Sequence, residues 1–451
     1  MRIAFSPPDI SDAEIEAVAE TLRSGWITTG LKTKEFEEKI AHFSGVKKAA
    51  CFSSATAALE CALRLLGVGP GDEVITSSYT YTASASVIYH VGATAVLVDT
   101  AEGSYEMDYE LLGRSITPRT KVVIPVDLAG RMCDYDLLMR VLDEHKGLFS
   151  PRTGTLQTLF DRVVVLADAA HAFGASYNGK RAGAVADFTV FSFHAVKNLT
   201  TAEGGALLWS QREGLDDEKA YEQLMMMSLH GQSKDALSKL APGAWEYDIC
   251  DVAWKCNMND VSAAIGLAQL KRYPALLARR QELVQRYLEE LARVGMTDKS
   301  SSCKLELLDH FPVGATSSCH LLLTRLVGKD QNFRNAVINE MANRGIACNV
   351  HYKPLPLFTA YRDRGFDIRD FPHALAQFSN ELTLPLHTLL SDDDVCFVAQ
   401  NLSEAYDECE RSLPDECPLP DECSLPDECS LPSERSLPGE CSPKHESSAQ
   451  S

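Results

Sequence analysis

The chain has 451 residues, of which 45% are hydrophobic and 24% charged, so it is long enough for two or more globular domains. Its formal net charge of -20 disfavours a nucleic-acid partner, because phosphate backbones are bound by clustered Lys and Arg. No stretch approaches the roughly 18 apolar residues of a membrane span, and the N-terminus lacks the apolar run of a signal peptide. Fourteen cysteines without a CxxC pair indicate reduced thiols and no metal site, so we expect a cytoplasmic protein.

The first predicted elements are two helices. Ser11 and Glu14 have the spacing of a capping box, which predicts a helix that ends near Gly25. A second helix is expected over residues 34–43. Trp26 and Ile27 lie in the loop between them, and we interpret them as packing residues, with a place at the mouth of a site as the alternative.

The first predicted strand covers residues 49–52 and is followed by the sequence S-S-A-T at 53–56 and a helix over 57–66. A strand, small polar residues and a helix in this order place free N–H groups where they can hold an anion. An ordinary N-cap by Ser54 is the more frequent explanation of this pattern alone. The pattern therefore predicts a phosphate site only if other residues support it.

The glycine-rich sequence Gly67–Gly71 follows a helix and precedes a strand over 73–76. A dinucleotide-binding loop needs the reverse order, so these residues are interpreted as a helix stop and a turn. This interpretation excludes a nicotinamide cofactor. Tyr81 opens the next helix at the end of a strand, where an aromatic ring can cover a flat ligand or pack in the core.

Strands and helices alternate as far as residue 144, and this order is typical of an α/β fold with a doubly wound, largely parallel sheet. The elements expected in this part cover residues 95–98, 108–116, 121–126 and 134–144. Residues 145–160 break the rhythm with Lys, Pro, Arg, Thr and Gly, and we expect a surface insertion there.

The segment Val163–Trp209 contains three apolar runs that suit buried strands, and the first two run directly into polar residues. Asp168 and His171 follow the first run. Ser192, His194 and Lys197 follow the second. Because ligands of open α/β sheets bind beyond the carboxyl ends of the strands, we expect these side chains to converge on one pocket.

The C-terminal part is predicted to be more helical. A long amphipathic helix starts after Asn257, is broken near Pro274 and ends near Val294. A smaller α+β unit follows, with strands over 320–326 and 347–351 and helices over 332–344 and 391–406. The predicted domains are an N-terminal segment with the large domain (1–260), a small C-terminal domain (261–409) and a disordered acidic tail of six-residue repeats (410–451).

The chemistry of these residues matches the parts of pyridoxal phosphate. Its aldehyde needs an amine to form a Schiff base, which Lys197 can supply, and its pyridine nitrogen needs a carboxylate, which Asp168 can supply. His171 can donate to the ring hydroxyl. The remaining partners are an aromatic ring and groups for the phosphate, available as Tyr81 and as Ala55, Thr56 and Ser192.

Residues from Gly25 to about Asn401 resemble the sugar-nucleotide aminotransferases of the DegT/StrS type, among the fold-type I pyridoxal-phosphate enzymes. The motifs that carry the resemblance are G-W-I-T-T-G, S-S-A-T-A-A-L, D-A-A-H-A, F-S-F-H-A-V-K-N-L-T-T-A-E-G-G, K-C-N-M-N-D-V-S-A-A-I-G-L-A-Q-L and V-H-Y-K-P-L. The resemblance implies a Schiff-base role for Lys197 and a mostly parallel sheet in a large domain, with a smaller α+β domain. It also implies a homodimer in which Asn257 reaches the phosphate of the neighbouring subunit.

The implied activity is the transfer of an amino group, with glutamate as donor and 2-oxoglutarate as product, to a keto group of a nucleotide-linked sugar. Carbon 4 of the sugar is the expected position, and cell-surface polysaccharide or another amino-sugar product is the expected outcome. Two alternatives stay open at this point. The acceptor could be a cyclitol or another cyclic ketone, or the protein could be a non-catalytic regulator that keeps the fold.

Overall fold

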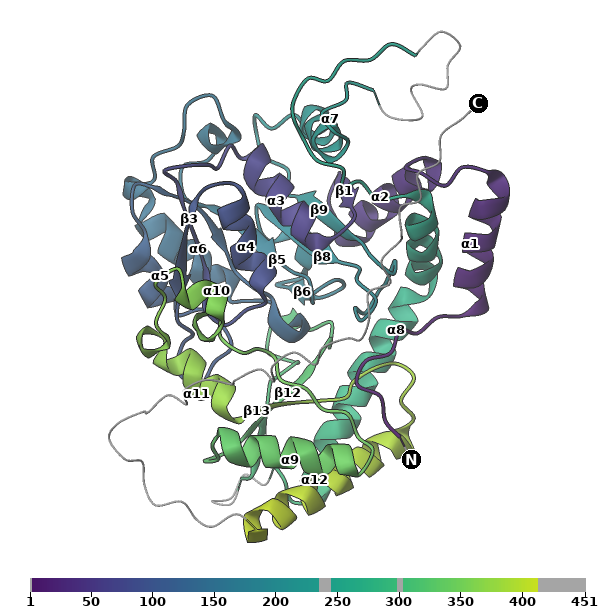
Figure 1. Ribbon diagram of the computed structural model, residues 1–451, viewed down its shortest axis with the longest axis vertical. Helices are drawn as coiled ribbons and strands as arrows, with labels where there is room; N and C mark the ends of the chain where they lie inside the picture. The colour runs from purple at the N-terminus through teal and green to yellow at the C-terminus, as the bar shows by residue number, and fades with distance from the viewer. Residues whose placement is uncertain (1, 235–244, 298–302, 413–451) are drawn as a thin grey trace, which may run out of the picture. The chain divides into compact units, whose positions relative to one another are not determined.

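A computed structural model describes residues 2–234, 245–297 and 303–412, which lie in one compact unit, Met1–Ser412 (Figure 1). The unit contains a seven-stranded sheet covered by helices and a separate three-stranded antiparallel sheet. None of the helices in these described ranges has both the length and the apolar content needed to cross a bilayer. The predicted repeat tail lies outside the described residues, apart from its first three.

The central sheet has the strand order β1-β9-β8-β5-β4-β2-β3. β9 is antiparallel to both of its neighbours, and the pairs from β8 to β3 are parallel. Helices cover both faces, so most of the strand residues are buried and the strands are continuous apolar runs. The strands are β1 Ala49–Phe52, β2 Glu73–Ser77, β3 Thr94–Val98, β4 Thr120–Ile124, β5 Val164–Asp168, β8 Phe188–Ser192 and β9 Gly205–Trp209.

Alternate residues of these strands point to opposite faces and form two apolar cores. One core contains residues of α2 (Leu31–Ser44), α5 (Tyr109–Ser115), α6 (Tyr135–Glu144) and the first half of α8 (Asp260–Arg293). The other contains residues of α3 (Ala55–Leu65), α4 (Thr82–His90) and α7 (Asp217–Ser228). α1 (Asp12–Ser24), with the predicted capping box, packs on α8. The α/β prediction is confirmed.

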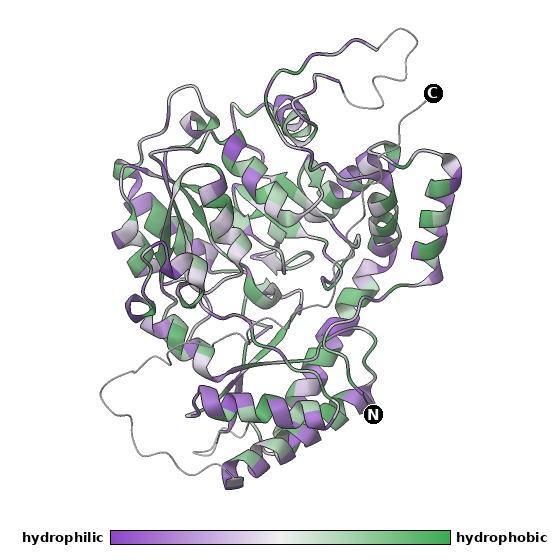
Figure 2. Cartoon of the chain, viewed as in Figure 1, coloured by the Kyte–Doolittle hydropathy of each residue, from purple (hydrophilic) through white to green (hydrophobic). Residues whose placement is uncertain are grey.

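A third core lies around the second half of α8 and the sheet β10-β12-β13. Figure 2 shows apolar residues in the strands of the central sheet and hydrophilic residues along α9 and α12. The elements of this part are β10 Leu305–Leu307, β12 Leu322–Leu326, α9 Gln331–Asn343, α10 Thr359–Arg362, α11 Pro372–Asn380, β13 Glu381–Leu384 and α12 Asp392–Ser412. A small sheet, β11-β6-β7, joins Ala315–Thr316 to the hairpin Ser176–Tyr177 and Lys180–Arg181.

Short 3-10 helices connect several of these elements. They are η1 Leu128–Gly130, η2 Lys146–Leu148, η3 Leu156–Leu159, η4 Ala182–Ala184, η6 Leu355–Leu357 and η7 Ile368–Asp370. Two of them lie in the predicted insertion 145–160, which is tied to the large sheet: Arg152 pairs with Asp72 at 2.8 Å, and the buried Gln157 donates to the carbonyl of Leu66.

Three predictions about the C-terminal elements were wrong: a helix break, a strand and the end of the last helix. α8 is continuous through Pro274, because the neighbouring Tyr273 and Leu277 are buried and their packing offsets the roughly 3 kcal/mol that a proline costs inside a helix. No continuous strand forms over residues 347–351: Asn349 forms an isolated bridge to Thr383, and the preceding Ile346 forms one to Ile3 on a different segment. α12 extends to Ser412, since the buried Cys409 keeps its last turns packed. The predicted boundary at residue 260 stays a prediction.

Candidate active site

A cavity of about 510 Å³ opens at the edge of the central sheet where the parallel strands end. It brings together groups from β5, β8, the start of α3, the start of α4 and the segment that follows residue 348. Seven of the predicted site residues line it: Ala55, Thr56, Tyr81, Asp168, His171, Ser192 and Lys197. The convergence expected from the sequence is therefore present.

Asp168 is the last residue of β5, and its carboxylate is held in the cavity wall by two donors. The hydroxyl of Ser84 donates to Oδ2 at 2.6 Å, and the backbone N–H of Ala170 donates to Oδ1 at 3.2 Å. Burial raises the pKa of Asp168, while these hydrogen bonds and the amine of Lys197 oppose the rise. The result is a fixed, buried carboxylate that a cationic ring nitrogen would stabilise.

His171 is buried and its protonation state follows from its partners. The backbone N–H of Ala129 donates to Nδ1 at 3.1 Å, so the neutral ring carries its proton on Nε2. Burial lowers the pKa of His171 well below its usual value, and Lys197 and His351 lower it further. Nε2 lies 3.3 Å from the hydroxyl of Tyr352. His171 therefore offers an N–H donor on the cavity side.

Lys197 lies in the turn after β8, where its backbone N–H donates to the carbonyl of His194 at 2.9 Å. Burial lowers the pKa of its amine to about 8, although Asp168 acts in the opposite direction. A large share of the amine is consequently neutral near pH 8. The neutral amine is the form that attacks an aldehyde.

The start of α3 forms the far wall of the cavity. Ser54 caps the helix, since its hydroxyl accepts a hydrogen bond from the N–H of Ala57 at 3.1 Å. Ala55 and Thr56 are the first two residues of the helix, between the cap and Ala57. The start of β9 runs directly against this turn: a Cβ on Gly205 would lie 2.3 Å from the backbone nitrogen of Ala55. Main chain therefore packs directly against main chain behind this turn, and the positive end of the helix dipole points towards the cavity.

Tyr81 precedes α4, and 60% of its surface is exposed. Core packing, one of the two interpretations of this residue, is therefore wrong. Its ring lies 6.0 Å from that of Tyr352, at an angle of 45°. An exposed aromatic ring at a cavity wall is suited to cover a flat ligand. Ile27 is 52% exposed and Trp26 is half-buried, so neither belongs to the buried core, and their packing at an interface stays a prediction.

Asn257 does not line the cavity of its own chain. It pairs through its backbone with Phe52, and its side chain contacts Thr29 and Lys255. The adjacent carbonyl of Cys256 accepts from Ser53 at 2.7 Å, just before the start of α3. Its predicted contact with the phosphate of a neighbouring subunit stays a prediction.

Four residues of the site were not predicted: Ser84, His320, His351 and Tyr352. Ser84 had a signal, because a polar residue on a helix that follows a buried strand is unexpected on its inner face. His351 is half-buried near Lys197, and desolvation together with the charge of Lys197 lowers its pKa to about 3. The two histidines and Tyr352 come from the distant C-terminal part. His351 and Tyr352 lie in the motif V-H-Y-K-P-L, which indicated the family but not their place in the cavity.

The cavity residues fit pyridoxal phosphate. They supply a partly neutral amine, a buried carboxylate with fixed donors, an N–H donor on His171 and the N-terminus of a helix. These are the groups that its aldehyde, pyridine nitrogen, ring hydroxyl and phosphate require. Lys197 and Asp168 would hold the reactive ends, and the Ala55–Thr56 turn with Ser192 would hold the phosphate.

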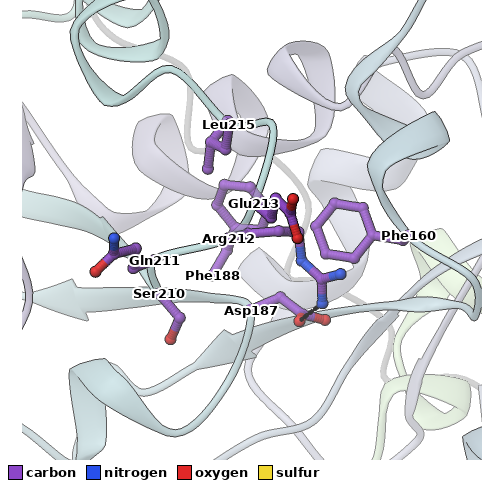
Figure 3. Close-up of a pocket in the computed structure, with 8 residues that line it drawn as sticks. All are labelled: Phe160, Asp187, Phe188, Ser210, Gln211, Arg212, Glu213 and Leu215. Carbon is purple, nitrogen blue, oxygen red and sulfur yellow. Dashed lines mark hydrogen bonds and ion pairs between the residues drawn. The ribbon is translucent and has the colours of Figure 1, made fainter.

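A second pocket, of about 260 Å³, lies at the opposite edge of the sheet (Figure 3). Asp187 forms ion pairs there with Arg162 at 2.8 Å and with Arg212 at 3.1 Å, and it accepts from the N–H of Val165 at 2.8 Å. The guanidinium of Arg212 also covers the ring of Phe160 at 3.9 Å. The charge of Asp187 is therefore matched within the protein.

Comparison with known proteins gives consistent matches over most of the chain. The family model described as the DegT/DnrJ/EryC1/StrS aminotransferase family matches residues 8–403. The spore coat polysaccharide biosynthesis protein SpsC of Bacillus subtilis is 36% identical over 398 residues, which cover 87% of this chain and 94% of SpsC.

Two solved structures resemble the fold closely. The putative sugar aminotransferase Spr1654 from Streptococcus pneumoniae, in its PLP form, has a TM-score of 0.86 and is 49% identical in sequence. The match covers 91% of this chain and 100% of the Spr1654 chain. Helicobacter pylori PseC, an aminotransferase involved in the biosynthesis of pseudoaminic acid, has a TM-score of 0.76 and 26% identity, with 90% and 100% coverage.

Proposed function

The chain belongs to the DegT/DnrJ/EryC1/StrS aminotransferase family, and from this premise we propose that it transfers an amino group from glutamate to a keto group of a nucleotide-linked sugar. It is a fold-type I aminotransferase that depends on pyridoxal phosphate. The observation that carries the proposal is the presence of Lys197 and Asp168 in one cavity, at the ends of adjacent strands.

Bound pyridoxal phosphate supplies an aldehyde for the amino group and a ring that spreads negative charge from the reacting carbon. Lys197 provides the amine that holds the aldehyde, and with a pKa of about 8 it can also accept and return a proton at the reacting carbon. Its place at the sheet edge keeps it within reach of both substrates in turn.

Asp168 and His171 would act on two other atoms of the ring, its pyridine nitrogen and its hydroxyl oxygen. The carboxylate of Asp168 is fixed by Ser84 and Ala170, so it stabilises a proton on the pyridine nitrogen. The Nε2–H of His171 faces the cavity because Nδ1 is occupied by Ala129, and it is placed to donate to the ring oxygen. Tyr81 covers one face of the ring and excludes water from it.

The relatives support a sugar as the acceptor. Spr1654 is described as a putative sugar aminotransferase, and SpsC as a protein of spore coat polysaccharide biosynthesis. We extend this to a nucleotide-linked keto-sugar with the keto group at carbon 4, used for a cell-surface polysaccharide or another amino-sugar product. Val196 and Glu203 line the cavity and are exposed, and we propose that the substrate enters beside them.

A substrate panel tests this proposal. The purified protein loaded with pyridoxal phosphate is incubated with glutamate and a series of nucleotide-linked keto-sugars, and with inosose-type cyclic ketones as the alternative acceptors. We expect amination of a 4-keto-sugar, identified by mass spectrometry and NMR, with release of 2-oxoglutarate. Amination of the cyclic ketones alone would replace the nucleotide-sugar proposal with the cyclitol alternative.

We also propose that the protein acts as a homodimer with sites at the interface. The segment before Asn257 exposes a group of large apolar side chains that a second copy would cover: Trp245 (77% exposed), Tyr247, Ile249, Val252 (93% exposed) and Trp254. Asn257 would then lie near the phosphate of the neighbouring subunit. We place the protein in the cytoplasm, in keeping with the free thiols of its described cysteines.

Mixed dimers test the shared site. Lys197→Ala and Asn257→Ala are each expected to reduce activity, and if the two residues serve the same site from different chains, a mixed dimer keeps one intact site. Dissociating and reassociating the two variants in equal amounts should restore about a quarter of the wild-type activity. Without any restoration in a confirmed mixed dimer, Asn257 does not act across the interface.

A further inference from the structure

The segment Ser317–Leu321 crosses from the β10-β12-β13 sheet to the cofactor cavity, and it is fixed on both sides. Its backbone donates from Ser318 to the carbonyl of Gly130 at 3.0 Å and from His320 to the carbonyl of Ala129 at 2.9 Å. On the other side, Nη1 of the buried Arg280 donates to the carbonyls of Cys319 and His320 at 3.2 and 3.3 Å. The position of this segment is therefore determined by both parts of the unit.

Asn198, the residue after Lys197, is bonded to this segment with both ends of its side chain. Its Nδ2 donates to the carbonyl of Ser318 at 2.8 Å, and its Oδ1 lies 2.9 Å from Nδ1 of His320. An amide oxygen can only accept, so Nδ1 of His320 is the donor. The loop that carries Lys197 is thus tied to His320.

His320 also contacts the histidine that faces the cofactor site. Its ring centre lies 4.4 Å from that of His171, at an angle of 48°. The ring of His171 is also held by the N–H of Ala129, which donates to its Nδ1. The carbonyl of the same Ala129 accepts from the backbone N–H of His320. Removal of the His320 ring would leave one side of the His171 ring without packing.

The charges around His320 keep it neutral. The groups that face it are His171, Lys197, Arg280 and His351, and none of these four is an acid. Burial lowers the pKa of His320 well below its usual value, and the neighbouring His171, Lys197 and Arg280 lower it further. A neutral ring adds no second positive charge beside the amine of Lys197.

We propose that His320 is a positioning residue for the transamination chemistry, which holds the Lys197 loop through Asn198 and the ring of His171 through direct packing. It does not touch the reacting carbon in this arrangement. Its role is to keep two groups that follow different strands, an amine and an N–H donor, at fixed positions in the cofactor cavity. This role is independent of which sugar or ketone the enzyme aminates.

Variants of His320 test the proposal. His320→Leu removes the donor to Asn198 and the flat ring against His171, and we expect the rate of the half-reaction with glutamate to fall about 10- to 100-fold, with little change in the KM for glutamate. The visible circular dichroism of the bound cofactor, which reports its orientation, should also weaken. His320→Gln keeps an N–H donor for Asn198 and should recover most of the rate.

His310→Leu is the matched control. His310 is equally buried and bonds to Ser317 at 2.8 Å, but it does not line the cavity. It should lower the melting temperature without changing the dichroism or the rate. Asn198→Ala, at a half-buried position, gives a second measurement if His320→Leu fails to fold, and it should reproduce the loss of rate and dichroism.

A folded His320→Leu or Asn198→Ala variant with wild-type rate and dichroism would refute the proposal. If the wild-type protein does not react with glutamate, the proposed amino donor is wrong, while the dichroism of the bound cofactor still decides the role of His320.

Discussion

The two edges of the central sheet place a buried aspartate in opposite surroundings. At one edge, Asp187 is matched by two arginines and a backbone N–H. At the other edge, Asp168 has a hydroxyl and one N–H as its hydrogen-bond donors, and both Asp168 and Lys197 have shifted pKa values. Breaking a fully paired buried charge destabilises a fold, whereas groups with shifted pKa values that share a cavity indicate chemistry. The contrast predicts that mutations at the two edges have separate effects.

The largest expected effect is that of Lys197→Ala. Loss of the amine should reduce transamination by about 1,000-fold or more, because both covalent attachment and proton transfer depend on it. The melting temperature of the cofactor-free protein should change little. Rates are measured by 2-oxoglutarate release, and a variant that keeps more than a tenth of wild-type activity would contradict the assignment of Lys197.

Asp168→Asn should reduce the rate about 100-fold, since a neutral amide does not stabilise the cationic ring nitrogen. The stability of the cofactor-free protein should behave differently. Because the pKa of Asp168 is raised in the fold, its ionised form costs stability above its unfolded-state pKa, and the amide removes this cost. Urea unfolding at neutral pH should therefore show equal or higher stability, and a large loss would contradict this account.

Asp187→Asn should give the reverse result. The two arginines would lose their carboxylate, and the free energy of unfolding should fall by about 3 kcal/mol. The rate of transamination by the folded protein should stay at the wild-type level, because the residue lies at the far edge of the sheet. A comparable loss of rate per folded molecule would show that the two edges are coupled.

The smallest expected effect is a shift in a pH midpoint. The rate at which the cofactor-free protein takes up pyridoxal phosphate should rise with pH to a midpoint near 8, as the amine of Lys197 loses its proton. Asp168→Asn should lower this midpoint, because Asp168 raises the pKa of Lys197. Stopped-flow absorbance measures both, and Asp187→Asn, which should leave the midpoint unchanged, is the control.

The edge of the sheet with Asp168 and Lys197 was largely predictable from the sequence. Lys197 and Asp168 follow continuous apolar runs, and groups at the ends of adjacent parallel strands meet at one edge. The far edge was not predicted, because Arg162 and Asp187 lie before strands, where charged residues are common. His320, His351 and Tyr352 were missed for a different reason: they reach the cavity through docking of the C-terminal part, which leaves no local pattern.

The wall formed by Gly205 and the first turn of α3 has a consequence for engineering. The residues in contact there are main-chain atoms, and a Cβ would already be too close at 2.3 Å. Ser54 and Thr56 line the cavity on that wall, but the main chain behind them is packed too tightly to move back. Directed evolution for bulkier phosphate mimics can therefore shorten these side chains, but it cannot widen the pocket by shifting the turn itself.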